Sequence, residues 1–110
     1  MFEIKPLCKF PHNPAEDLVT DDGFGYYNRG AARIAAGRRQ EGIADLEKAK
    51  QQDAKFGLAY WLLGILYREE QPERALVEFQ SAAELFADNE TMAASAQLEA
   101  SKLRERLALS

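Results

Sequence analysis

The amino-acid sequence predicts an all-α fold made of helical hairpins, and three observations support this prediction. First, one pattern occurs twice, because Tyr26 and Gly30 recur at an identical spacing as Tyr60 and Gly64. A period of about 34 residues with aromatic residues and glycines at fixed places is typical of stacked helix-turn-helix units. Second, apolar residues within each copy recur at spacings of three and four, which is the period of a helix with one buried side. Third, glycines and prolines stand where such helices would begin or end, as at Gly37.

Alanines near the end of each copy follow almost the same period. Ala49 and Ala54 are matched by Ala82 and Ala87, at a spacing one residue shorter than that of the tyrosines and glycines. The second copy has therefore lost one residue, most simply in the turn between its two helices.

Residues 1–23 precede the repeats, and we expect an extended segment that contains one short helix. Its prolines restrain the backbone to extended conformations, while Asn13 followed by Pro14 is typical of a helix start. This helix is expected to end near Thr20. The segment also carries four large apolar side chains, namely Phe2, Ile4, Leu7 and Phe10. Because burying such side chains is favourable, we expect residues 1–13 to pack on the repeats and to cover part of their surface.

The first copy predicts helices over residues 24–36 and 39–52, with Gly37 as a left-handed cap between them. The second copy predicts helices over residues 56–69 and 72–86, the latter with Pro72 in its first turn. The second helix of each copy has residues at helical spacing that predict one buried stripe. The stripes contain Ile43, Leu46, Ala49 and Lys50 in the first copy, and Leu76, Phe79, Ala82, Ala83 and Phe86 in the second.

A fifth helix is expected from a cap at Asp88 or Asn89 to about residue 108. Its single apolar side contains Met92, Ala96, Ala100, Leu103 and Leu107. It lacks the glycine of the two copies and has no partner helix after it. We therefore expect it to cover the exposed side of the last hairpin, as the end of a helical array requires.

Small residues explain how the helices of each hairpin can approach closely. We expect Gly30 and Gly64 on the first helices to face Ala49 and Ala82 on the second helices. Bulky side chains are expected to fill the layers beside these crossings, namely Tyr26, Tyr60, Leu46 and Phe79.

The two copies resemble the tetratricopeptide repeat, with residues 24–56 as one repeat and 57–88 as the next. The resemblance implies a right-handed α-α superhelix of two hairpins, in which residues 89–108 form a capping helix and residues 24–110 form one domain. The chain departs from the family pattern at Gly42, where alanine is usual, and at Arg33, which stands in the place of Tyr67. It also has Ala54 and Ala87 where the family's repeats usually end in proline.

The resemblance further implies that a partner lies along the concave surface, which the first helix of each repeat lines. The corresponding residues here are Phe24, Tyr27, Ala31, Ile34, Leu58, Trp61, Ile65 and Arg68. Family members that bind a peptide's terminal carboxylate place Lys, Asn and Arg at several of these positions. The mainly apolar set in this chain favours an apolar protein or peptide segment instead. The alternative is that the protein's own residues cover this face.

A basic cluster lies at the end of the first predicted helix and the start of the second. It contains Arg29, Arg33, Arg38 and Arg39. Arg29 and Arg33 are one turn apart on the same side of the helix, so they could hold a carboxylate or phosphate in a forked geometry. The alternatives are a solvated surface and pairing with the acidic residues Asp21 and Asp22.

Composition and charge argue against a nucleic-acid-binding, membrane-spanning or exported protein. A net charge of −4 and a pI near 5.0 argue against nucleic-acid binding. The longest apolar run, from Gly57 to Tyr67, is shorter than the roughly 20 residues of a membrane span. Cys8 is the one cysteine, and the N-terminus lacks the apolar core of a signal peptide. We expect a cytoplasmic protein.

No pattern of residues indicates catalysis or a cofactor. Cys8 and His12 are too few for a structural zinc site or for a nucleophile with its base. The chain also lacks a glycine-rich phosphate loop. We therefore expect a non-catalytic protein-binding module, such as an adaptor, assembly factor or scaffold. The alternative is a structural subunit whose groove meets a second copy of the chain.

Overall fold

The computed structural model describes residues 22–109, and this part of the chain forms five α-helices without a β-strand. The helices are α2 (Gly23–Ala35), α3 (Arg39–Gln52), α4 (Gly57–Tyr67), α5 (Pro72–Leu85) and α6 (Glu90–Ala108). The predicted all-α class is therefore confirmed for the described residues. The extended segment and short helix that we predicted before Asp22 lie outside them.

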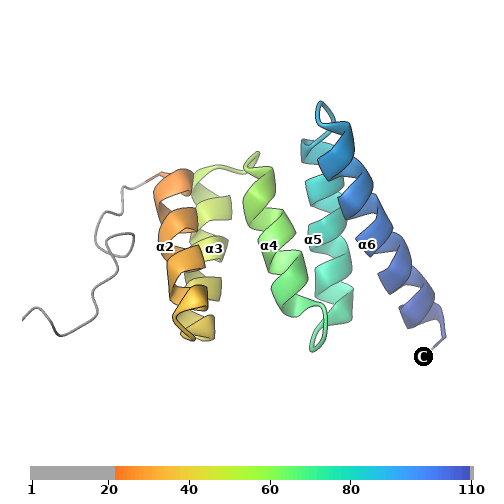
Figure 1. The fold of residues 1–110 in the computed structure, drawn as a ribbon, viewed down its shortest axis with the longest axis horizontal. Coiled ribbons are helices and arrows are strands. Elements are labelled where there is room, and N and C mark those ends of the chain that lie inside the picture. The colour runs from red at the N-terminus through yellow and green to blue at the C-terminus, as the bar shows by residue number, and fades with distance from the viewer. Residues whose placement is uncertain (1–21, 110) are drawn as a thin grey trace, which may run out of the picture.

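The five helices stand side by side in a row in chain order, and the turns between successive helices alternate between the bottom and the top of the row (Figure 1). The row is elongated, with extents of 61 × 31 × 22 Å. Helix α2 packs most extensively on α3, and α5 packs on both α4 and α6, whereas α3 and α4 meet over a smaller interface. The structure therefore consists of the hairpins α2–α3 and α4–α5, followed by α6. None of these five helices is both long and apolar enough to span a membrane.

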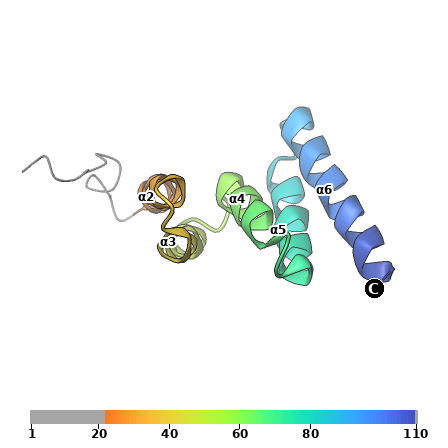
Figure 2. The same ribbon diagram turned by 60° about the horizontal axis from the view of Figure 1, so that its bottom comes forward.

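Helix direction changes along the row. When the molecule is turned, α2 and α3 are seen almost end-on while α6 runs obliquely across the view (Figure 2). The second hairpin is therefore rotated relative to the first, and the two are not stacked as parallel copies.

Local capping explains where α2 begins and ends. Asp22 is the N-cap, and its carboxylate accepts a hydrogen bond of 2.8 Å from the backbone N–H of Gly25. Gly37 has a φ of 87°, which confirms the predicted left-handed cap. The N–H of Gly37 then donates to the carbonyl oxygen of Ile34 at 3.0 Å, so the carbonyl groups at the helix end are satisfied.

Helix α4 ends at Tyr67, two residues earlier than the sequence predicts. Side chains from other helices satisfy the carbonyl groups at this end: Arg39 of α3 donates to the carbonyl oxygen of Leu66, and Arg106 of α6 donates to that of Arg68 at 3.2 Å. The carbonyl oxygen of Tyr67 itself accepts a local bond of 2.7 Å from the backbone N–H of Gln71, so both local and tertiary contacts satisfy the end of α4.

The predicted loss of one residue in the second copy is confirmed by the helix starts. Helix α4 starts at Gly57 and α2 at Gly23, while α5 starts at Pro72 and α3 at Arg39. The first of these two spacings is one residue longer than the second. The missing residue therefore falls between the start of α4 and the start of α5, but the prediction that it is lost from the turn was wrong. The turn after α4 (68–71) is one residue longer than the turn after α2 (36–38), whereas α4 itself has 11 residues and α2 has 13.

The core runs from α3 to α6. Its buried cluster contains Leu46, Leu63, Tyr67, Ala75, Phe79, Ala100 and Leu103. Leu46 and Phe79 are fully buried, as predicted. Tyr26 and Tyr60 are only half-buried, and a lysine ammonium group lies over each ring.

The glycines of the first hairpin do not face the residues that we predicted. A Cβ at Gly30 would come 2.9 Å from the carbonyl oxygen of Gly42, whereas the carbonyl oxygen of Ala49 lies 3.1 Å from a Cβ at Gly23. The helices are antiparallel, so the middle of α2 meets the early part of α3, and the end of α3 returns to the start of α2. The prediction that Gly30 faces Ala49 was therefore wrong.

The second hairpin requires the same correction. A Cβ at Gly64 would come 2.8 Å from the ring of Phe79, so Gly64 faces this aromatic side chain and not Ala82. Ala82 is nevertheless fully buried, as is its counterpart Ala49.

Candidate protein-binding surface

The predicted binding residues lie on one side of α2 and one side of α4, and we call them the candidate surface. They are Phe24, Tyr27, Ala31 and Ile34 on α2, and Leu58, Trp61, Ile65 and Arg68 on or just after α4. Phe24 is the most exposed large apolar residue of the set, with 62% of its surface accessible. The other seven are half-buried. The surface therefore consists mainly of side chains that are seated on the fold and still partly accessible.

An aromatic cluster joins the two halves of the candidate surface at one end. The ring of Phe56, which directly precedes α4, lies 5.1 Å from the ring of Tyr27 in an edge-on arrangement and 6.2 Å from that of Phe24. Both separations are within the range of favourable aromatic pairs. Burial also raises the pKa of the Tyr27 hydroxyl, so this side chain stays neutral at physiological pH.

Phe56 is a surface residue that the sequence analysis missed, although the sequence contains a signal for it. Phe56 stands one repeat period after Asp22 and occupies the same N-cap position, of α4 rather than α2. Asp22 caps its helix, whereas a phenylalanine cannot accept the hydrogen bond that a capping side chain accepts. Loss of a cap costs about 0.5–2 kcal/mol, so an aromatic residue at this position indicates a packing role.

The middle of the candidate surface is anchored to the core. The ring of Trp61 packs edge-on against Phe79 of α5, with 5.2 Å between centroids. Ile34 instead closes over α3, because a Cβ at Gly42 would come 2.4 Å from Cγ1 of Ile34. Ile34 therefore serves the packing of the first hairpin more than the accessible surface.

The two halves of the candidate surface are not packed along their whole length. Helix α2 and helix α4 are not among the extensively packed pairs, whereas α3 packs on α4. The structure thus brings Phe24 and Tyr27 close to the start of α4 through Phe56.

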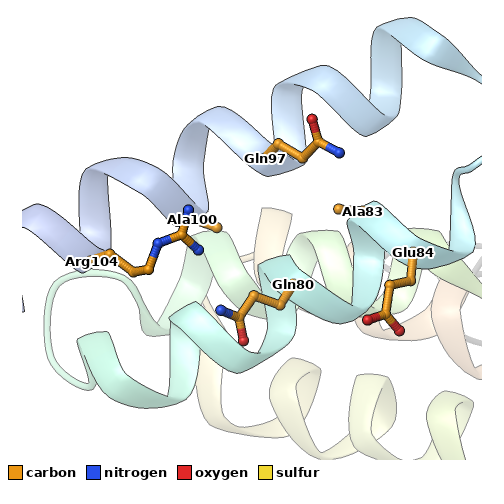
Figure 3. A pocket seen from close by; sticks show the side chains of 6 residues that line it. All are labelled: Gln80, Ala83, Glu84, Gln97, Ala100 and Arg104. Carbon is orange, nitrogen blue, oxygen red and sulfur yellow. The ribbon is translucent and has the colours of Figure 1, made fainter.

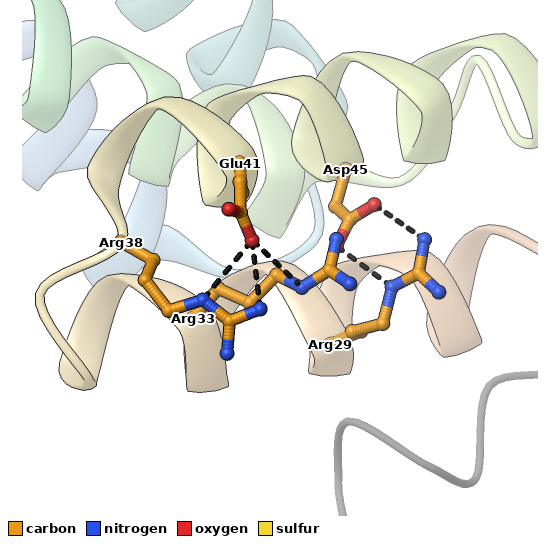
Figure 4. A network of polar contacts seen from close by, with 5 residues as sticks. All are labelled: Arg29, Arg33, Arg38, Glu41 and Asp45. Carbon is orange, nitrogen blue, oxygen red and sulfur yellow. Dashed lines mark hydrogen bonds and ion pairs between the residues drawn. The ribbon is translucent and has the colours of Figure 1, made fainter.

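Arg29 and Arg33 hold a carboxylate in the forked geometry that the sequence suggested, and this carboxylate is Asp45 of α3 (Figure 4). Nε and Nη2 of Arg29 donate to the two carboxylate oxygens at 2.9 and 2.8 Å, and Nη1 of Arg33 donates at 3.0 Å. Asp45 is 3% exposed. The sequence analysis did not identify this partner, because it compared the arginines only with Asp21 and Asp22. Of these two, Asp21 lies outside the described residues.

The other arginines of the basic cluster also have acidic partners on the protein. Arg38 donates from Nε and Nη2 to one oxygen of Glu41, at 3.0 and 2.7 Å, and Arg33 lies 3.8 Å from the same oxygen (Figure 4). Arg39 lies 3.8 Å from Glu70. The cluster is therefore engaged in contacts that hold helices and turns together, and its geometry matches a structural role.

A second polar network connects the two hairpins. Lys50 of α3 donates to both oxygens of Glu78 of α5, at 3.1 and 2.9 Å. Glu47 of α3 accepts hydrogen bonds of 2.7 Å from the Tyr67 hydroxyl and 3.1 Å from Arg74. Glu78 is 4% exposed. Sequence analysis placed Lys50 on the buried stripe of α3 but did not predict this network.

Burial and mutual contact perturb the pKa values of this network. Burial raises the pKa of the Glu78 carboxyl, although Lys50 opposes this effect. Burial alone would lower the pKa of Lys50, but the hydrogen bond and charge of Glu78 raise it above the ordinary value. Burial and the hydrogen bond to Glu47 raise the pKa of Tyr67. All three groups join α3 to the second hairpin.

Two clefts flank α6. One, of about 280 Å³, lies between α5 and α6 and is lined by Gln80, Ala83, Glu84, Gln97, Ala100 and Arg104 (Figure 3). The other, of about 270 Å³, lies between the end of α4 and α6 and is lined by Arg68, Glu99, Lys102, Leu103 and Arg106. We call the second the basic cleft. It contains Arg68, the last residue of the candidate surface.

No family model matches this chain, and neither a curated protein nor a solved structure is similar to it at a significant level.

Proposed function

We propose that this chain is a non-catalytic protein-binding module of the tetratricopeptide-repeat type. In this proposal the hairpins α2–α3 and α4–α5 form a short right-handed superhelix, which binds a protein or peptide segment through the candidate surface. The nearly constant period between equivalent helix starts supports the repeat. The rotation between successive pairs of helices supports a superhelical arrangement (Figure 2).

Helix α6 acts in this proposal as the cap of the array. Leu98 of α6 takes the place in the period that Gly30 and Gly64 hold in the two hairpins. The two glycines permit close helix crossings, whereas Leu98 is 56% exposed and too large for one. The inner side of α6, which includes Ala100 and Leu103, is buried against the core. One side of α6 is therefore packed on the second hairpin, while Leu98 is too large to permit another close helix crossing. This arrangement is expected of a capping helix.

The observation that carries the proposed function is the partly exposed aromatic cluster of Phe24, Tyr27 and Phe56 at one end of an apolar row. Aromatic side chains are enriched among residues that dominate binding energy at interfaces, because they bury a large area with little loss of conformational freedom. Phe24 is accessible and pairs with Phe56, whose ring in turn packs on Tyr27. A preorganised apolar anchor of this kind suits a protein partner.

Self-assembly is the second candidate function, because the two repeats are fewer than the roughly three that such arrays usually need for stability. A second copy would then cover the candidate surface. Molar mass in solution separates the two functions: an adaptor is expected to be monomeric over a range of concentrations, and a self-assembling subunit to be a dimer or larger.

Photocrosslinking in the native cell tests the location of the binding surface. We would replace Phe24 with p-benzoylphenylalanine, and make the same replacement at Val77 of α5 as a matched control. Both positions are exposed, at 62% and 58%, but Val77 is outside the candidate surface. The proposal predicts crosslinks to another polypeptide from position 24 and few or none from position 77. Crosslinks only between copies of the chain would favour self-assembly, and equal crosslinking at both positions would contradict the proposed surface.

A further inference from the structure

The basic cleft has a charge opposite to that of the protein as a whole. Three cationic side chains line it, Arg68 from the end of α4 and Lys102 and Arg106 from α6, together with one carboxylate, that of Glu99. The lining residues thus carry a formal charge of +2, in a chain whose net charge is −4. A concave site of one sign in a protein of the other sign concentrates ligands that complement it.

Glu99 is shared between two of the cations. Nη1 of Arg68 lies 3.1 Å from one carboxylate oxygen of Glu99, and Nζ of Lys102 lies 3.6 Å from the other. The Lys102 side chain is 61% exposed, and that of Arg68 is 37% exposed. Nε of Arg68 also lies 3.8 Å from the exposed carboxylate of Glu69. Both cations remain accessible to solvent, so a further anion can approach them without displacing Glu99.

The basic cleft continues the candidate surface. Ile65 and Arg68 are three residues apart and share one side of the helix end, while Trp61 lies one turn before Ile65 on the same side. The side chains along this side of α4 therefore change from apolar, at Trp61 and Ile65, to cationic at Arg68, next to α6. A ligand that lies along this row would meet aromatic and aliphatic side chains first and cationic groups next.

We propose that the partner segment is a peptide that places an apolar side chain against Trp61 and Ile65 and a carboxylate in the basic cleft. This inference rests on the proposed protein-binding function and specifies the chemistry of the partner. The arginine and lysine would contribute charge-assisted hydrogen bonds to the carboxylate, and the apolar row would contribute burial of nonpolar area. The charge also sets the direction of the peptide relative to α4, because only one end of the row is cationic.

Selection of peptides against three forms of the full-length chain tests this inference. The probe is a phage-displayed library of random eight-residue peptides with free C-termini. It is selected on the wild type, on the Arg68→Gln/Lys102→Gln variant, and on an Arg104→Gln/Lys55→Gln control. The control removes the same two charge types from exposed positions outside the basic cleft. Circular dichroism and thermal melts establish that all three forms are folded.

The expected result is that wild type and control enrich peptides with both an apolar residue and an acidic group, and that the cleft variant loses the acidic preference alone. Enrichment of apolar residues without any acidic preference would overturn the inference and leave the proposed function intact. Failure of the wild type to enrich any peptide would overturn both.

Binding of synthetic peptides then identifies the source of the carboxylate. Each selected peptide is compared with versions in which its acidic side chains or its C-terminus are converted to amides. We expect one conversion to weaken wild-type binding by about fivefold or more, with a smaller effect at high salt. If every amide-converted peptide bound as tightly as its parent, the proposal that a carboxylate lies in the basic cleft would be contradicted.

Discussion

The two hairpins share one backbone pattern but are held together by different interactions. In the first hairpin, the buried residues of α2 are all glycines, and the polar contact across the crossing is the pair of arginines on Asp45. In the second, Gly64 accommodates the fully buried ring of Phe79, which also supports Trp61. One hairpin therefore depends on charge and close backbone approach, and the other on the packing of an aromatic ring.

Equivalent positions show how this difference arises. Arg29 and Arg33 of α2 correspond to Leu63 and Tyr67 of α4, and Leu46 of α3 corresponds to Phe79 of α5. The repeat thus specifies where two helices cross and where glycine is needed, but not whether the neighbouring positions are polar or apolar. The shared geometry of the two hairpins therefore does not imply shared energetics.

The largest expected effect comes from removing the buried carboxylate within the first hairpin, compared with the buried carboxylate that joins the two hairpins. Asp45→Asn leaves two arginines without their shared anion, and breaking a buried ion pair costs about 3–5 kcal/mol. Because the arginine side chains are 24% and 22% exposed, we expect about 3 kcal/mol. Glu78→Gln should cost less, because Lys50 retains Glu47 at 3.3 Å and burial already disfavours the ionised form of Glu78. Chemical denaturation of both variants measures the two values, and a larger cost for Glu78→Gln would reverse the comparison.

Replacing a glycine by alanine should cost a different amount of stability in each hairpin, because the new methyl group meets backbone atoms in the first and an aromatic ring in the second. A Cβ at Gly42 would come 2.7 Å from the carbonyl oxygen of Gly30, whereas one at Gly64 would meet the side chain of Phe79 at 2.8 Å. A side chain can adjust more readily than a backbone in a hairpin. Overpacking costs about 1–3 kcal/mol, and we expect Gly42→Ala at the upper end of this range and Gly64→Ala at the lower. Thermal melts of the two variants, with Glu84→Gln as a surface control, make the comparison. Gly42→Ala with the stability of wild type would show that the first crossing is looser than the structure indicates.

The smallest expected effect is a loss of stability at alkaline pH, from the contacts between the hairpins. Tyr67 and Lys50 have pKa values raised above their ordinary values of 10.0 and 10.5. A raised pKa means that the folded state holds the proton more tightly, so this contribution is complete below about pH 10 and is lost as the pH rises above it. The melting temperature should therefore fall above about pH 10. Tyr67→Phe should reduce this fall while lowering stability at neutral pH, and an equally steep fall in the variant would exclude Tyr67 as its source.

Sequence reasoning succeeded where local chemistry decides the structure. The bounds of α3, the cap at Gly37 and the start of α5 at Pro72 follow from residues within a few positions of each feature. It failed where the register between antiparallel helices decides. The partners of Gly30, and the carboxylate bound by Arg29 and Arg33, depend on which turn of α3 lies opposite α2.

The same register explains Gly42, which stands where the tetratricopeptide repeat that the chain resembles usually has alanine. The usual alanine at this position would bring a methyl group to 2.4 Å from Ile34 and 2.7 Å from the carbonyl oxygen of Gly30. Glycine is therefore required by the close crossing of this particular hairpin. The basic cleft could not be predicted either, because it combines the end of α4 with residues of α6 that come much later in the chain.

Trp61 is the most direct probe of the proposed binding surface, because it is the one tryptophan of the chain and lies in the middle of the candidate surface. The measurement is its fluorescence during titration of the full-length protein with the peptide selected above, labelled so that anisotropy reports binding independently. The account predicts a saturable change in Trp61 emission with the same midpoint as the anisotropy, and its loss when Ile65 is replaced by Ser but not when Val77 is. Saturable anisotropy without any change at Trp61 would place the peptide elsewhere and contradict the proposed surface.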